Sequence, residues 1–132
     1  MFPITVLGYV VNVYSALNYD IHLDLPSSFP TEGMEMCTYT YTEDSAHIET
    51  GMTCRCRLVG ILRRKTVSNY EEYHASTRMV TQRLNRLNSW VLVRVYGFDK
   101  YHRLLVELID FISGVSINSE LKMQQHLYME YN

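Results

Sequence analysis

The sequence contains no run of apolar residues that approaches the roughly 20 needed to span a membrane as a helix, and we expect no membrane partner. Its first segment, MFPITVLGYVVNVY, lacks the basic residues and the small-residue cleavage site of a secretory signal peptide. The three cysteines cannot pair into a closed set of disulfides, which favours a reducing compartment. We therefore expect an intracellular protein, cytoplasmic or nuclear, and such a short chain also suits a viral origin.

Glycine and proline are scarce as well, with six and three residues, which excludes a collagen-like chain and argues against disorder. The chain has 132 residues, of which 47% are hydrophobic and 20% charged. A chain of this length buries roughly two-thirds of its unfolded surface on folding, which is enough for one core. We expect a single domain over residues 1–132.

Positive charge is absent from the first third of the chain. Residues 1–54 contain seven acidic residues and no Lys or Arg, whereas residues 55–103 contain eleven Lys or Arg against three acids. The formal net charge of −2 therefore hides a basic centre, which can bind a polyanion locally. The alternative is that these basic residues form a solvated helix face and pair with the acidic first third.

Alternating apolar and polar residues predict several short strands. We expect strands at 4–14, 20–25 and 54–61, a hairpin from CTYTYT to AHIETGMT, and two later strands in WVLVRVYGF and LLVELIDFI. In the 54–61 strand, the even positions Cys54, Cys56 and Leu58 are expected to point to one face, toward the interior.

Two segments have a helical pattern. Val80, Leu84 and Leu87 recur at helical spacing, after Ser68 or Asn69 as the N-cap. A final helix is expected from Ser116 or Asn118 through Tyr128. Five core strands with one inserted helix fit a small closed barrel better than a parallel α/β sheet.

Three segments occur in the order of one known family. CRCRLVGI resembles the R-L-x-G-I-D-x-P-E strand of staphylococcal nuclease-like (thermonuclease) domains, YEEYHASTRMVTQRLNRL resembles the next helix, and VRVYGFDKYHRLLVEL resembles the D-x-Y-G-R-x-L hairpin. NYDIHLDL and SINSELKMQQHLY are similar to the family's D-G-D-T strand and terminal helix. The resemblance implies a mainly β fold with helices (α+β), an OB-type five-stranded barrel with an inserted hairpin or loop at about 26–52.

Active members of this family cut DNA and RNA with Ca²⁺, and the resemblance places Asp20 at a metal aspartate and Arg57 and Arg103 at the phosphate-binding arginines. Leu62 stands at the second metal aspartate and Lys65 at the catalytic glutamate. One carboxylate is a weak anchor for Ca²⁺, and an ammonium group cannot act as a general base at neutral pH. We therefore expect a degenerate member with no catalytic residues, no metal and no cofactor. Asp20 would hold Ca²⁺ only if residual nuclease activity existed.

The main hypothesis is a binding module that holds nucleic acid without hydrolysis. Basic residues replace the acids after Ile61, which leaves a cationic cleft for a single strand or a phosphate backbone. Its residues are Arg57, Arg63, Arg64, Lys65, Arg83, Arg86 and Arg103. The aromatic candidates for base stacking are Tyr19, Tyr96, Tyr101 and Trp90, although Trp90 and Tyr96 also suit the core of a strand.

Other interpretations remain open at this point. A structural or assembly protein would use the 26–52 extension for protein contacts, with TYTYT adding a strand to another chain. A residual Ca²⁺-dependent nuclease is a further alternative. Arg57 and Arg103 have a structural alternative too, in which they pair with Asp20.

The cysteines suggest a metal site only weakly. Cys37, Cys54, Cys56 and His47 would be a zinc set, but C-x-C on one strand is a poor chelate. We expect Cys54 and Cys56 to be buried small hydrophobic residues instead.

Overall fold

The computed structural model describes residues 3–29, 35–39, 48–65 and 70–131, with residues 35–39 and 48–50 described by their backbone alone. The elements are β1 (Ile4–Ser15), β2 (Asn18–Leu23), β3 (Glu35–Tyr39), β4 (Ile48–Leu58), β5 (Ile61–Arg63), α1 (Tyr70–Arg86), β6 (Trp90–Phe98), β7 (Leu104–Ile109), α2 (Ile117–Lys122) and β8 (Tyr128–Glu130). No helix in this part of the chain is long and apolar enough to cross a membrane.

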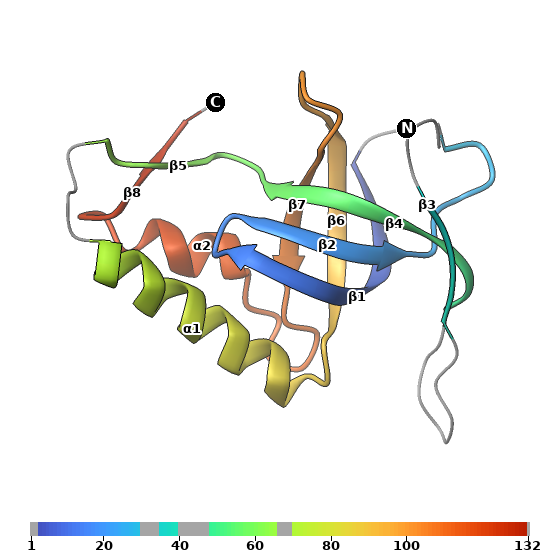
Figure 1. Ribbon diagram of the computed structural model, residues 1–132, viewed down its shortest axis with the longest axis horizontal. Coiled ribbons are helices and arrows are strands. Elements are labelled where there is room, and N and C mark those ends of the chain that lie inside the picture. Colours follow the sequence, from blue (N-terminus) through green and yellow to red (C-terminus); the bar gives the residue numbers. More distant parts are fainter. Residues whose placement is uncertain (1–2, 30–34, 40–47, 66–69, 132) are drawn as a thin grey trace.

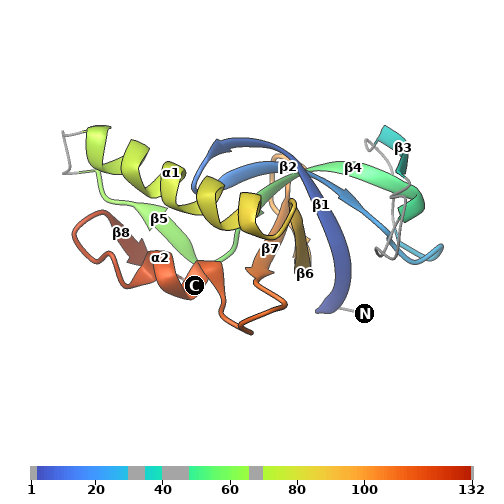
Figure 2. The same ribbon diagram turned by 90° about the horizontal axis from the view of Figure 1, so that it is seen from below.

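Five strands close into a barrel. β1 pairs with β2 and β6, β6 pairs with β7, β7 runs parallel to β4, and β4 returns to β2. The single parallel pair requires a crossover, and the segment from β4 to β7 supplies it with α1 packed beside the barrel (Figures 1 and 2). The predicted mainly β fold, a five-stranded closed barrel with two helices, is therefore confirmed.

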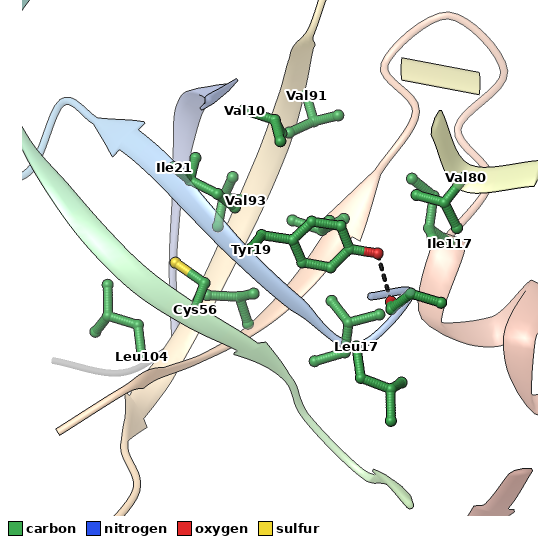
Figure 3. Close-up of a cluster of buried hydrophobic side chains, with 14 of the residues drawn as sticks. Val10, Leu17, Tyr19, Ile21, Cys56, Val80, Val91, Val93, Leu104 and Ile117 are labelled. Carbon is green, nitrogen blue, oxygen red and sulfur yellow. Dashed lines mark hydrogen bonds between the residues drawn. The ribbon is translucent and has the colours of Figure 1, made fainter. Parts of the chain in front are cut away.

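The interior follows the alternation predicted from the sequence. Cys54, Cys56 and Leu58 are 3%, 0% and 0% exposed, so this strand presents its even positions to the core as expected. They belong to one apolar cluster with the inward residues of the neighbouring strand β2, with those of β6 and β7, and with Val80 of α1 (Figure 3). Burial raises the pKa of the Cys56 thiol well above its usual value, so this thiol stays protonated.

The two strands of the hairpin predicted near residue 40 are present, and the second of them continues directly into a barrel strand. β3 pairs antiparallel with the first part of β4, whose second part pairs with β2, so β4 is one strand where two were expected. Phe29, inside the predicted 26–52 extension, is 3% exposed and packs against Phe98 with ring centroids 5.7 Å apart. Phe29 is therefore packed against the sheet, and the turn of the predicted hairpin lies outside the described residues.

The end of the chain differs from the prediction. α2 ends at Lys122, whereas a helix through Tyr128 was expected. Tyr128 instead begins β8, which pairs antiparallel with β5. The helical prediction fails because a tertiary contact dominates here: the Tyr73 hydroxyl donates to the Leu127 carbonyl at 2.9 Å, and the Tyr73 and Tyr128 rings meet edge to face. α1 runs as expected, but its predicted N-cap, Ser68 or Asn69, lies outside the described residues.

Candidate functional site

A polar network lies on the outer face of β1, β2 and β4. Asp20 accepts from Arg55 Nε at 2.7 Å, from the Tyr14 hydroxyl at 2.5 Å and from Asn12 at 3.2 Å. The Arg55 guanidinium also lies 4.4 Å from the centre of the Tyr14 ring. Burial alone would raise the pKa of Asp20, but the hydrogen bonds from Tyr14, Arg55 and Asn12 outweigh it and lower that pKa. Asp20 is thus ionised, with both oxygens engaged by neighbouring side chains.

The alternative in which Arg57 and Arg103 pair with Asp20 is wrong, because Asp20 pairs with Arg55 instead. Asp20 lies opposite Arg55 across the β2–β4 pair, while Arg57 lies opposite Asn18. The strand pattern predicts that Arg55 points outward, yet it gives no register between β2 and β4. The partner of Asp20 could therefore not be read from the sequence.

Arg57 and Arg103 both lie next to Asn18: Arg57 is its cross-strand partner, and Arg103 is hydrogen-bonded to its side chain. Arg103 Nη1 donates to Asn18 Oδ1 at 3.2 Å, and Arg57 Nη2 donates to the Ile61 carbonyl at 3.0 Å. Arg103 also forms an ion pair with Asp99 at 2.7 Å. A carboxylate therefore balances the charge of Arg103, whereas Arg57 is bonded only to a backbone carbonyl in the described residues.

Arg83 and Arg86 lie apart from the other predicted phosphate-binding residues. Both belong to the last turn of α1. Arg63 instead stacks on Tyr73, in the first turn of α1, with its guanidinium 3.8 Å from the ring centre. The rise of an α-helix separates Tyr73 and Arg86 by about 20 Å along the axis. The seven predicted residues therefore occupy two regions rather than one cleft.

Four of the seven form a basic surface around β5, which we define as Arg57, Arg63, Arg64 and Lys65. In the described part of the chain, none of them has a carboxylate partner; Arg64 donates to the Gln125 carbonyl instead. Six other basic residues do form ion pairs with carboxylates, namely Arg55, Arg78, Arg83, Arg94, Arg103 and Lys122. Uncompensated positive charge is therefore concentrated at β5.

Of the four aromatic candidates for stacking, two are buried and two are exposed. Tyr19 is fully buried and Trp90 is 6% exposed, so neither ring is available for stacking, and the core role of Trp90 is confirmed. Tyr96 and Tyr101 are 38% and 66% exposed, so the core role considered for Tyr96 is wrong. Tyr14 is 54% exposed beside Arg55, but the sequence marked it only as the end of an apolar run.

The predicted burial of Cys54 and Cys56 is confirmed, since both point into the barrel. Among the residues that the structure describes, no three His, Cys, Asp or Glu side chains gather as metal ligands would. The Cys37 side chain and His47 lie outside the described residues. Leu62 and Lys65 are exposed, one on β5 and one just after it.

The edge of the six-stranded sheet is formed by β3. The sheet runs β2-β1-β6-β7-β4-β3, so β3 has β4 on one side and no described strand on the other (Figure 1). Such an edge presents backbone N–H and C=O groups that an extended segment of another chain can pair with.

Comparison with known proteins supports the fold. No family model matches the chain, and no curated protein matches it. A solved structure that matches is described as the extended Tudor domain TD3 from mouse TDRD1 in complex with a MILI peptide containing dimethylarginine 45. The TM-score is 0.58 and the identity 14%, over 100% of this chain and 96% of the other. At this identity the likeness establishes the fold alone.

Proposed function

We propose that this protein is a protein-binding module that holds an extended, basic peptide segment along the free edge of β3. The observation that carries the proposal is the position of β3, which ends the sheet with one neighbour in the described structure. A peptide strand can pair with such an edge through backbone hydrogen bonds, while its side chains determine specificity. The solved domain that shares the fold was captured with a peptide, which supports a peptide-binding role for this chain.

Charge suggests the class of peptide. The chain from residue 26 to residue 52 has five acidic residues and no Lys or Arg. These acids are Glu32, Glu35, Glu43, Asp44 and Glu49. An arginine-bearing peptide would be opposite in charge to this acidic segment of the sequence and would associate faster for that reason. Dimethylation leaves the charge of arginine in place, so both forms of a peptide are suitable probes.

A charge-reversal experiment tests the proposal. The probe is a 12-residue peptide that alternates Arg with Val or Thr, compared with the same peptide carrying Glu in place of Arg. We expect the Arg peptide to bind, and we expect Glu35→Lys with Glu49→Lys to weaken it at least tenfold in a fluorescence-anisotropy titration. The matched control, Glu71→Lys with Glu130→Lys, changes two exposed acids and shifts the net charge equally, but should leave the affinity nearly unchanged. Equal losses in both variants, or no binding of the Arg peptide by the unaltered protein, would contradict the proposal.

A second candidate function, binding of a nucleic-acid backbone, is favoured by the basic surface at β5. If its basic residues contact three phosphates of a single strand, affinity should fall about 20-fold between 50 and 200 mM salt. We expect Arg63→Ala, Arg64→Ala and Lys65→Ala together to remove most of this salt dependence. The control is a variant of three cations that already have carboxylate partners: Arg78→Ala, Arg94→Ala and Lys122→Ala. An unlabelled oligonucleotide competed against a labelled one provides the measurement, and identical salt slopes in the two variants would reject this function.

A further inference from the structure

The turn between β7 and α2 exposes three apolar side chains within five residues. Ile112 is 74% exposed, Phe111 47% and Val115 39%. Turn positions are ordinarily filled by polar residues, and a cluster of exposed apolar side chains on a soluble surface often marks an interaction site. We call Phe111, Ile112 and Val115 the apolar turn.

Hydrogen bonds fix the apolar turn before any partner arrives. The Asp110 carboxylate accepts from the backbone N–H groups of Ile112 at 2.9 Å and Ser113 at 3.1 Å. The Asp110 backbone accepts from Gly114 at 2.7 Å and donates to Val115 at 2.9 Å. Gly114 has a φ of +76°, which a residue with a side chain adopts only with strain. A surface that is already ordered loses little conformational entropy on binding.

Arg83 holds this turn against the last turn of α1. Its guanidinium pairs with Asp110 at 3.2 Å and with Glu120 at 2.6 Å, which links α1 to the start of the turn and to α2. A groove of about 380 Å³ lies between the end of α1 and the turn. Its lining residues are Arg83, Arg86 and Leu87 from the helix end and Asp110, Ile112, Ser113 and Val115 from the turn.

The charges around the groove indicate what would fill it. Two carboxylates balance Arg83, whereas Arg86 is exposed and has no carboxylate partner in the described residues. An occupant would therefore place apolar side chains against Ile112 and Val115 and a carboxylate beside Arg86, since a charge-assisted hydrogen bond to Arg is among the stronger polar contacts. Stable attachment to an anionic membrane takes several basic residues or two anchors, and a single free cation favours a protein over a lipid surface.

We propose that the apolar turn and the end of α1 form a second docking surface, which takes an amphipathic, acidic segment of a partner protein. The surface shares no residue with the β3 edge or with the basic surface at β5, so its occupant is distinct in charge from the peptide proposed for β3.

The test uses two synthetic amphipathic helical peptides of 14 residues, each with a leucine face, one with a Glu-rich polar face and one with a Lys-rich polar face. Each is titrated into ¹⁵N-labelled full-length protein. With the Glu peptide, we expect amide shift changes in residues 83–87 and 110–116. Arg86→Glu should reverse the preference in favour of the Lys peptide, and Ile112→Ser with Val115→Ser should weaken Glu-peptide binding at least tenfold. Met123→Ser is the control, because Met123 is 80% exposed and does not line the groove.

Three results would overturn the proposal. They are no shift changes with the Glu peptide, equal binding of the Glu and Lys peptides by the unaltered protein, or co-sedimentation with phosphatidylserine vesicles that Ile112→Ser abolishes. The last result would assign the turn to a membrane. If the double serine variant unfolds, Arg86→Glu still decides the question, because its exposed side chain has no ion-pair partner to lose in the described structure.

Discussion

Replacing Asn118 with leucine is expected to lower the free energy of unfolding by about 3 kcal/mol, although the two side chains are similar in volume. Asn118 is 2% exposed. Its Oδ1 accepts from the Leu108 backbone N–H at 3.1 Å, and its Nδ2 donates to the carbonyls of Val106 at 3.1 Å and Val59 at 3.3 Å. One side chain thus links α2 to β7 and to the turn after β4. Leucine would leave the Leu108 N–H buried without a partner, and urea denaturation measures the loss.

Asn118→Asp separates the acceptor role of this side chain from its donor role. The carboxylate still accepts from Leu108, but it places negative charge against the carbonyls of Val59 and Val106. Its pKa should therefore be higher in the folded than in the unfolded protein, so the folded state binds the proton more tightly. The stability deficit should shrink as pH falls from the folded pKa toward the unfolded one.

The control for both Asn118 variants is Ser119→Ala, at the next and exposed position of α2, which should change stability by no more than about 0.5 kcal/mol. A loss of stability below about 1 kcal/mol for Asn118→Leu would contradict this account, because it would show that water or a shifted backbone group accepts the hydrogen bond of the Leu108 N–H instead.

Asn118 also shows how much of the structure could be predicted from the sequence. Its position near the start of a helix was predictable, but Ser116 is the cap, whose side chain accepts from the Ser119 N–H. Alternation and helical spacing record which face of an element is buried. They do not record which other element lies against it, so the three backbone partners of Asn118 were not predictable.

The same limit explains the outcome for the candidate site. The outward direction of Arg55 and the inward direction of Cys54 and Cys56 follow from the period of a strand. The pairing of Asp20 with Arg55 depends on the β2–β4 register. Arg83 meets carboxylates 27 and 37 residues further along the chain, which neutralises a charge that composition alone counted as free.

β8 illustrates a different limit. A strand of three residues is too short for its alternation to differ from that of a helix end. Tyr128 became a strand residue because β5 offered an unpaired edge and Tyr73 a ring to pack against. A tertiary contact, rather than the local conformational preference, therefore determined the structure of this segment, as is usual for short segments.

Replacing Gly8 with alanine is expected to lower the free energy of unfolding by about 2 to 3 kcal/mol, because the barrel has no room for one methyl group there. A Cβ at this position of β1 would lie 2.6 Å from Val93 Cγ2, 2.9 Å from Ile21 Cγ2 and 3.0 Å from Leu23 Cδ2. The first two are branches at Cβ, which move only with the backbone or through χ1, so they yield poorly. Thr5→Val, at an exposed position of the same strand, is the control and should have little effect.

A double-mutant cycle with Val93→Ala tests whether this steric contact is the cause. Val93→Ala alone should destabilise by roughly 2 kcal/mol by leaving a cavity. Because it also removes the Cγ2 nearest to the new methyl group, the double variant should be more stable than the sum of the single losses predicts, by about 1 kcal/mol or more. Simple additivity would mean that the barrel relaxes around residue 8 and contains space that the packing does not show. A coupled result would instead indicate a filled interior at this level, so a partner would have to bind on the outside, at an edge such as β3 or a groove such as that beside Arg86.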